Sequence, residues 1–317
     1  MVIKTDLAII GGGIAGLSAA MYAGRFGLDV TVFDSKVGGT IVLTDTVENY
    51  PGFKKLTGQE LSDKIKEQAA QFKMKIVNRN VEKVIKKHSC FYIDTKKERY
   101  KARAVILATG TKWRKLKVPG EKELDKRGVH YCALCDGPIY KGKVLAIVGG
   151  GDSAAKEALT LANMGSKVYL IARGPKIMPE PINYKRIMDN KKIEIIPNTE
   201  VVEILGKDKV EKIKLSKKYK GSDELDVGAI FIDVGRIPMT RLAKEIGVKL
   251  NKKGEVIADN LMKTNIEGFF VGGDVSDTPF KQAVTAAAEG STAAFSAYDY
   301  VSKTPLCSYG DEPLNPK

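Results

Sequence analysis

A glycine-rich turn between an apolar strand and a helix occurs twice in this chain, about 140 residues apart. The first copy reads Gly11-Gly-Gly13-Ile-Ala-Gly16 and follows the apolar residues 7–10; the second follows residues 144–148. Each copy leads into a segment rich in helix formers and then into another apolar strand, which is the order of a βαβ unit. This internal repeat predicts an α/β chain with two Rossmann-like nucleotide-binding modules.

The apolar pattern predicts the other elements of both modules. Leu61, Ile65, Ala69 and Phe72 repeat at helical spacing, so the helix that they belong to should bury one stripe. The segment from Thr304 onward, with three prolines and mixed charge, is expected to be peripheral. Strands are expected at 7–10, 30–33, 81–85, 91–93, 104–108, 144–148, 168–171 and 229–233, a small β segment at 204–215, a strand and turn at 268–274, and helices at 17–25, 58–72, 153–164, 240–246 and 282–301.

Composition places the chain among soluble globular proteins. Its 317 residues suggest two domains of ordinary size, with 43% hydrophobic and 28% charged residues. No run approaches the roughly 20 apolar residues of a membrane span, and the first residues show no signal-peptide cleavage pattern. The sequence therefore predicts a cytoplasmic protein that does not bind membranes.

The formal charge of +14 raises the question of nucleic-acid binding. The lysines are spread through every segment and alternate with acids, as in residues 82–87 and 207–212, and no reader motif with interleaved aromatic residues accompanies them. We therefore expect that the protein does not bind nucleic acid. Attraction to an acidic protein partner is the better explanation of the charge.

Two cysteines stand in the motif Cys132-Ala-Leu-Cys135-Asp136 shortly before the second glycine turn. A pair separated by two residues can close a small disulfide ring and reopen it, as two-electron thiol exchange requires. Zinc needs about four N or S ligands, and neither Cys90 nor Cys307 has a neighbour at ligand spacing. The pair therefore favours a redox function in a reducing compartment over a metal site.

The first glycine turn has the full context of a dinucleotide site. Gly11 allows the tight turn, Gly13 lets the backbone approach a pyrophosphate, and Gly16 lets the helix pack on the strand. Asp34 follows about 20 residues later at the end of the next strand, where a carboxylate would hold ribose hydroxyls.

The second turn differs at the corresponding strand end, where Arg173 replaces the acid. An arginine there favours a 2′-phosphate, whereas a carboxylate favours a free 2′-hydroxyl. The residues assigned to a nicotinamide nucleotide are Gly149, Gly151, Asp152, Ser153, Ala154, Arg173 and Arg236.

In this order, these features resemble the low-molecular-weight thioredoxin reductases, flavoproteins of bacteria and archaea. The resemblance extends from the first strand to about Val301. Its motifs are Gly11–Gly16, Val47-Glu-Asn49-Tyr-Pro-Gly52, Ala108-Thr-Gly110, Cys132-Ala-Leu-Cys135-Asp136, Gly149–Ala154, Gly235-Arg-Ile-Pro238, and Gly272-Gly-Asp274-Val followed by Lys281-Gln282-Ala283.

The resemblance implies two Rossmann-like domains of three-layer ββα type, one inserted in the other. A discontinuous FAD domain would comprise 1–114 and 242–317, and a pyridine-nucleotide domain with the cysteines would comprise 115–241. The residues that it implies for FAD are Gly11, Gly13, Ile14, Ala15, Gly16, Asp34, Ser35, Gly39, Thr40, Thr44, Asn49, Ala108, Thr109, Gly110, Gly273, Asp274, Lys281, Gln282 and Ala283.

The implied activity is thioredoxin-disulfide reduction in a homodimer. Hydride would pass from a reduced nicotinamide to the flavin and on to the Cys132–Cys135 disulfide, with thioredoxin or a glutaredoxin-like protein as acceptor. Cys135 would face the flavin, Cys132 would attack the partner disulfide, and Asp136 would be the general acid and base. A domain rotation on linkers near 113–117 and 239–242 would alternate the two encounters.

The chain departs from this family at the electron-donor site. NADPH-using relatives have a basic H-R-R-x-x-x-R run where this chain has the segment 172–178, and only Arg173 of the three arginines is present. Lys176 could compensate in part. The sequence therefore leaves NADPH, NADH or another electron donor open. A related ferredoxin or flavodoxin oxidoreductase with a different acceptor is the alternative function.

Overall fold

The computed structural model describes residues 2–304 and divides them into two compact units. The first unit contains residues 2–112 and 238–304, and the second contains Trp113–Ile237. From the sequence, the boundaries were expected at 114/115 and 241/242. Cys307 and the rest of the segment expected to be peripheral lie outside the described residues, apart from Thr304.

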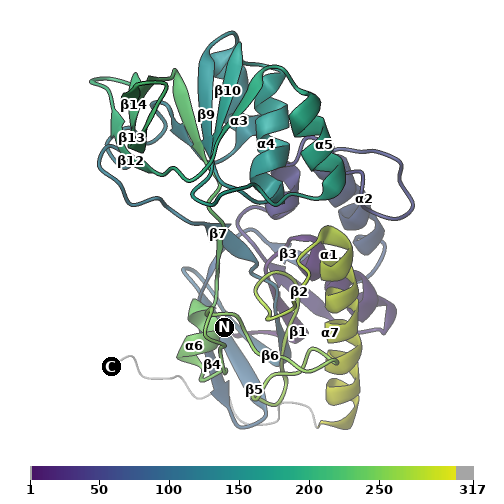
Figure 1. The fold of residues 1–317 in the computed structure, drawn as a ribbon. Coiled ribbons are helices and arrows are strands. Elements are labelled where there is room, and N and C mark those ends of the chain that lie inside the picture. The colour runs from purple at the N-terminus through teal and green to yellow at the C-terminus, as the bar shows by residue number, and fades with distance from the viewer. Residues whose placement is uncertain (1, 305–317) are drawn as a thin grey trace. The chain divides into compact units, whose positions relative to one another are not determined.

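The first unit is built on a seven-stranded sheet (Figure 1). Its order is β3-β2-β1-β6-β5-β4, and β17 pairs with the second half of β6. Pairing is parallel from β3 to β6 and to β17, whereas β4 and β5 form an antiparallel hairpin against the first half of β6. The strands are β1 (Val2–Ile10), β2 (Val30–Phe33), β3 (Met74–Val77), β4 (Val81–Lys87), β5 (Cys90–Thr95), β6 (Arg99–Leu107) and β17 (Phe269–Val271).

Helices cover one face of the parallel strands β1, β2, β3 and β6. The other face of these strands packs in a core that includes residues of the β4–β5 hairpin. Leu7 and Ile9 of β1 pack with α1 and α7, which lie side by side in Figure 1. Ala8 and Ile10, which point the opposite way, pack with the hairpin residues Val84 and Ile93 among others. A strand buried on both faces is continuously apolar, as residues 7–10 are. The helices are α1 (Ile14–Arg25), α2 (Gly58–Ala69), α6 (Arg241–Glu245) and α7 (Ala283–Lys303), with the 3₁₀ helix η1 (Thr40–Leu43).

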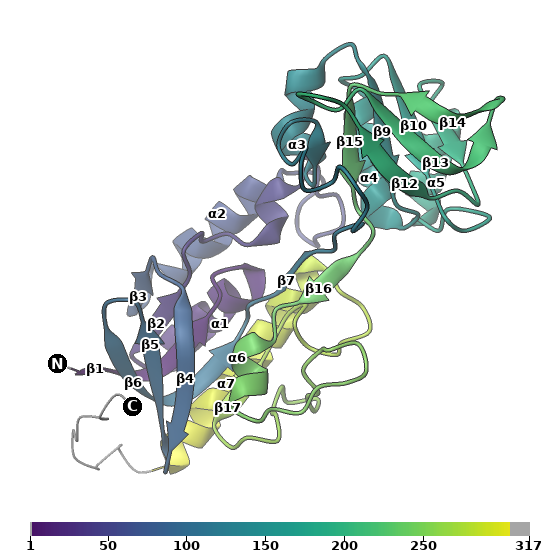
Figure 2. The ribbon, with the colours of Figure 1, turned by 90° about the vertical axis from the view of Figure 1, so that its left-hand side faces the viewer.

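The second unit repeats this plan. Its parallel sheet has the order β11-β10-β9-β15-β8, and a separate antiparallel sheet has the order β12-β13-β14. Figure 2 shows the antiparallel sheet alongside the parallel sheet of the same unit. The elements are β8 (Val129–His130), α3 (Ala133–Asp136), η2 (Gly137–Tyr140), β9 (Val144–Val148), α4 (Asp152–Ala162), β10 (Lys167–Ile171), α5 (Pro181–Asp189), β11 (Ile193–Ile196), β12 (Val201–Leu205), β13 (Lys212–Tyr219), β14 (Ser222–Asp226) and β15 (Ala229–Ile232).

Two apolar cores make the second unit a three-layer structure. Leu145 and Ile147 pack with Ala154, Ala158 and other residues of α4. The opposite face, with Ala146 and Val148, packs with residues of β12 and β13. The predicted α/β class with two Rossmann-like domains is confirmed.

The strands and helices expected from the sequence are present, with shifted ends. The small β segment expected at 204–215 consists of two strands, β12 and β13, separated by residues 206–211. The helix α5 and the strands β3, β11 and β14 were not expected. Short strands β7 (Thr111–Trp113) and β16 (Arg236–Pro238) in the connecting segments form a two-stranded sheet. None of the helices between residues 2 and 304 is long and apolar enough to cross a membrane.

Candidate active site

The cysteine motif forms a disulfide at the start of a short helix. Cys132 and Cys135 are bonded to each other, and Cys132 is the N-cap of α3, which follows β8 directly. The Cys135 N–H lies 3.1 Å from the Cys132 sulfur, and the Asp136 N–H donates to the Cys132 carbonyl at 3.2 Å. Cys132 is buried and Cys135 is exposed. The structure therefore contains the reducible bond that the redox interpretation requires.

A buried acidic cluster lies behind this helix in the same unit. Glu157 of α4 accepts a hydrogen bond from the Ala133 N–H, next to Cys132. Burial raises the pKa of Glu157 to about 8, and Asp233 adds to the rise, while Arg236 and the Ala133 amide oppose it. Burial also raises the pKa of Asp233, which follows β15. The Arg236 guanidinium thus opposes the rise in pKa of both carboxyl groups. With a pKa of about 8, Glu157 is mostly protonated at neutral pH.

Three polar atoms of this cluster are buried without a hydrogen-bond partner within residues 2–304: Glu157 Oε2, Asp233 Oδ2 and Arg236 Nη1. Buried polar atoms are normally paired, so such atoms indicate a place for a ligand or water. They offer both donors and acceptors, as a carboxamide requires. The cluster therefore fits the nicotinamide end of a dinucleotide. The guanidinium carbon of Arg236 also lies 4.7 Å from the centre of the Trp113 ring. Of these residues, only Arg236 was expected from the sequence.

We expect Glu157→Gln to remove a pH-dependent loss of stability. Between the ordinary pKa of 4.5 and about 8, the folded state keeps a proton that the unfolded state has released, so stability falls as pH rises through this window. A neutral glutamine does not have this penalty and should stabilise the protein by about 1–3 kcal/mol at pH 8.5, with little change at pH 5. Thermal unfolding from pH 5 to 9 measures the effect. The exposed Glu211→Gln should follow the parent at every pH, and a uniform destabilisation by Glu157→Gln would contradict the assignment.

The first glycine turn joins β1 to α1. A Cβ at Gly16 would lie 1.8 Å from the Gly11 carbonyl oxygen, so only glycine allows this contact. The Asp34 carboxylate accepts hydrogen bonds from the Gly12 N–H at 2.6 Å and the Lys36 N–H at 2.8 Å, which fixes it beside the turn. No side-chain cap occupies the N-terminus of α1, so its first N–H groups and the helix dipole are free for an anion.

The other predicted FAD residues gather around this turn in the first unit. Ala15 lies against Gly273: a Cβ at Gly273 would be 2.9 Å from the Ala15 Cβ. A Cβ at Gly13 would lie 3.5 Å from the Gly39 Cα. Ala108, at the end of β6, donates its N–H to the Ile10 carbonyl. The ends of β1, β6 and β17 and the loop of Gly39 therefore lie around one glycine-lined cradle, which fits a pyrophosphate and its ribose. Ile14 begins α1, Ser35 and Thr40 are exposed, and Thr44 is the C-cap of η1.

Three hydrogen bonds join predicted FAD residues to distant parts of the chain. The Asn49 amide donates to the Gln282 side-chain oxygen at 3.2 Å, across 233 residues of sequence. The Thr109 hydroxyl donates to the Met239 carbonyl, and the Met239 N–H donates to the Gly110 carbonyl. Ala283 is the first residue of α7. Long-range contacts therefore fix the segments of Asn49 and of Thr109-Gly110 within the first unit.

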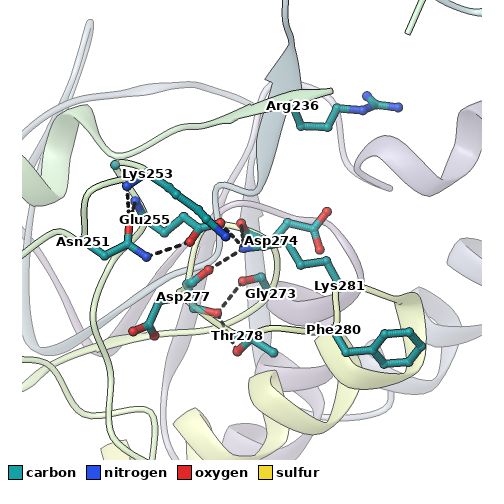
Figure 3. Close-up of polar contacts among 12 residues, drawn as sticks. Arg236, Asn251, Lys253, Glu255, Gly273, Asp274, Asp277, Thr278, Phe280 and Lys281 are labelled. Carbon is teal, nitrogen blue, oxygen red and sulfur yellow. Dashed lines mark hydrogen bonds and ion pairs between the residues drawn. The ribbon is translucent and has the colours of Figure 1, made fainter. Parts of the chain in front are cut away.

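Lys281 closes the loop that contains Asp274 (Figure 3). Its ammonium group donates to the carbonyls of Asp274 at 2.8 Å and Ser276 at 2.5 Å, and pairs with the Glu255 carboxylate at 3.0 Å. The Asn251 amide orients Glu255 from the other side at 2.7 Å. Lys281 therefore braces the loop through its side chain. Glu255 and Asn251 had no signal in the sequence, because they lie in an irregular segment far from any motif.

The second glycine turn joins β9 to α4. Gly151 has open space where a side chain would be, as close approach of a ligand requires. Ser153 is exposed and Ala154 is packed in the core of the unit. Asp152 is occupied by protein groups: its carboxylate accepts from the Glu180 N–H and the Asn183 amide and pairs with Lys156.

The segment after β10 runs past the second glycine turn. The Met178 N–H donates to the Gly150 carbonyl at 2.7 Å, and Met178 is 74% exposed. Arg173 and Lys176 are exposed, and neither makes an ion pair with the residues that the structure describes. Both cations are therefore free to meet a phosphate.

Comparison with known proteins gives a consistent set of relatives. The family model described as pyridine nucleotide-disulphide oxidoreductase matches residues 5–290. The chain is 38% identical to the thioredoxin reductase of Bacillus subtilis over 299 residues, 93% of this chain and 94% of that protein. Crystal structures of thioredoxin reductases from Lactococcus lactis and T. acidophilum are similar, with TM-scores of 0.91 and 0.88 and identities of 34% and 36%. They cover 95% and 93% of this chain, which in turn covers 100% and 98% of theirs.

Proposed function

Because the chain belongs to the pyridine nucleotide-disulphide oxidoreductases, and within them to the low-molecular-weight thioredoxin reductases, we propose that it reduces the disulfide of a thioredoxin. The observation behind this proposal is the Cys132–Cys135 disulfide, followed directly by Asp136 in the unit that contains the second glycine turn. A glutaredoxin-like protein is the related acceptor. Reduction of an acceptor disulfide requires a pair of thiols in this arrangement. A ferredoxin or flavodoxin oxidoreductase transfers its electrons to a different acceptor and would not use the pair.

FAD and a nicotinamide dinucleotide are the cofactors of this function. The residues around Gly11–Gly16 and Asp34, with the loop of Asp274, would hold FAD, which supplies two-electron redox chemistry when bound. The second glycine turn, with Glu157 and Arg236, would hold the nicotinamide nucleotide. The exposed Arg173 and Lys176 would meet a 2′-phosphate, so NADPH is the donor that these charges favour.

The chain's own residues perform the thiol chemistry. Once the disulfide is open, the Cys132 thiolate attacks one sulfur of the partner disulfide, and the Cys135 thiolate then resolves the mixed disulfide. The leaving thiolate takes a proton from Asp136. Since Cys132 is buried in the disulfide form, a partner reaches it only after a local rearrangement or a movement of the unit.

The assembly and location follow from the same proposal. We place the protein in the cytoplasm as a homodimer that binds neither nucleic acid nor membranes. With a charge of +14, it would be steered toward an acidic thioredoxin, so association should slow as salt is added.

An anaerobic titration with NADPH, and separately with NADH, tests the first half of the function. Loss of the visible flavin absorbance shows which donor is accepted. Addition of an oxidised thioredoxin should then restore the absorbance and produce its two thiols. If a fully reduced protein left the thioredoxin disulfide intact, the proposed acceptor would be wrong.

We expect the purified protein to be yellow, with about one FAD per chain, since all parts of the cradle around Gly11 and Asp34 are present. Gly16→Val should abolish FAD retention, because its Cβ cannot fit against the Gly11 carbonyl. The flavin-to-protein absorbance ratio measures this. A parent protein that stays colourless after incubation with FAD would refute the cofactor assignment.

A further inference from the structure

His130 is buried next to the redox turn and uses both nitrogens of its ring. It is 5% exposed and lies two residues before Cys132. Its Nδ1 is 3.2 Å from Asp136 Oδ2, and its Nε2 is 2.9 Å from the Tyr140 hydroxyl oxygen. Tyr140 is only partly buried. The three side chains thus form one line from the partly buried Tyr140 to the residue after Cys135.

Hydrogen-bond chemistry fixes the direction of this line. An ionised carboxylate only accepts, so with Asp136 ionised the imidazole proton is on Nδ1. Nε2 is then an acceptor, and the Tyr140 hydroxyl donates to it. When Asp136 is protonated, both hydrogen bonds reverse: Asp136 donates to Nδ1, and Nε2–H donates to the Tyr140 oxygen. The same three residues therefore accommodate both protonation states of Asp136 without moving.

The surroundings keep the imidazole neutral. The Phe231 ring lies 5.4 Å from the His130 ring and is nearly perpendicular to the Tyr140 ring. Burial lowers the pKa of His130, against the opposite effects of Asp136 and Asp125. Burial, with a contribution from Asp136, raises the pKa of Tyr140. At pH 7 the line therefore consists of two neutral groups and one carboxyl, which suits proton transfer better than a fixed ion pair.

We propose that His130 and Tyr140 are positioning residues that form a proton relay to Asp136. The proposal rests on the proposed function, in which Asp136 protonates a leaving thiolate. After this step the ring returns from the Nε2–H to the Nδ1–H tautomer, which donates to the ionised Asp136. Asp136 then regains its proton as Nδ1–H passes to Oδ2, the Tyr140 proton passes to Nε2, and water gives one proton to the Tyr140 oxygen. One proton enters at Tyr140, one leaves at the thiolate, and no electron moves in the relay.

The test compares two disulfides that differ in their need for a proton. The leaving thiolate of 2-hydroxyethyl disulfide is strongly basic and needs an acid, whereas the aromatic thiolate of 5,5′-dithiobis(2-nitrobenzoate) leaves unprotonated. Full-length protein is reduced with dithiothreitol and desalted, and its reaction with each disulfide is followed at pH 7. Neither thioredoxin nor a nicotinamide nucleotide is needed, so a failure of the proposed acceptor would not affect this measurement.

The variants are His130→Asn, whose amide can still donate to Asp136 but cannot relay a proton, and Tyr140→Phe, which removes one hydroxyl. Each should react about 10-fold more slowly with the aliphatic disulfide, and within about twofold of the parent with the aromatic one. The double variant should be no slower than either single variant, because either substitution alone already interrupts the proton relay. Added imidazole should restore the aliphatic rate in His130→Asn.

His88→Asn is the matched control, because it changes the other histidine at a position with a φ of 52°, which asparagine tolerates. It should match the parent with both disulfides. Equal slowing with both disulfides would show a structural role only, and unchanged rates in His130→Asn and Tyr140→Phe would exclude the relay. Either result overturns the proposal.

Discussion

Cys132→Ser should lower turnover with a thioredoxin disulfide by at least about 10³-fold, because the attacking thiolate is lost and a serine hydroxyl is not ionised at neutral pH. Binding of FAD should be unaffected, since Cys132 lies in the second unit and the predicted FAD residues lie in the first. Donor-dependent bleaching of the flavin should persist. Anaerobic absorbance and a thioredoxin-coupled assay measure the two properties separately.

Cys135→Ser is the matched comparison. Its remaining Cys132 thiolate can still attack a partner, but no second thiol is present to resolve the mixed disulfide. It should therefore trap thioredoxin in a covalent complex that dithiothreitol releases, whereas Cys132→Ser should not. If only Cys132→Ser trapped thioredoxin, Cys135 would be the attacking thiol. This outcome needs testing because Cys135 is the more exposed of the two cysteines in the disulfide form. Full turnover in Cys132→Ser would remove the pair from the electron path.

The sequence predicts this fold well where local and tertiary demands agree. Residues 7–10 are apolar at every position because both faces of β1 are covered, and Gly16 is required by contact with the Gly11 carbonyl. The helix α5 was not expected: it begins at Pro181 and buries only Asn183 and Ile187. Its nine residues are fewer than the window of about 11–18 residues in which a helical period is recognised.

The site residues that motifs did not reveal are those whose partners are brought together only by the fold. Glu157 lies among alanines on α4 and shows its role only when Asp233 and Arg236 pack beside it. Glu255 supports Lys281 from an irregular segment. The sequence gives no sign of the role of His130, because its pairing with Asp136 and Tyr140 depends on the turn of α3 and η2. Spacing along the chain does not encode these contacts.

The combined variant Gly174→Arg/Met178→Arg should bind NADPH about 10²-fold more tightly than the parent. Each charge-assisted hydrogen bond to a phosphate contributes about 1.5–3 kcal/mol, and exposure reduces this value. The structure leaves room for both side chains: a Cβ at Gly174 meets nothing closer than 3.6 Å, and Met178 is 74% exposed beside the second glycine turn. Arginine suits this site better than lysine, because its planar group binds phosphate through two N–H groups. Flavin bleaching against NADPH concentration measures the gain.

NADH has no 2′-phosphate, so its apparent affinity should change little in the same variant. Gly174→Gln/Met178→Gln is the control for size without charge and should show no gain with either nucleotide. Because the new contacts are partly exposed, the advantage should shrink as salt is raised from low to physiological concentration. If the parent already binds NADPH in the low micromolar range, Arg173 and Lys176 are sufficient, and the absence of two arginines from the segment 172–178 has no consequence for the donor. If instead neither nucleotide reduces the flavin in the parent or the variant, the second glycine turn does not receive the physiological donor, and the electrons enter this protein by another route.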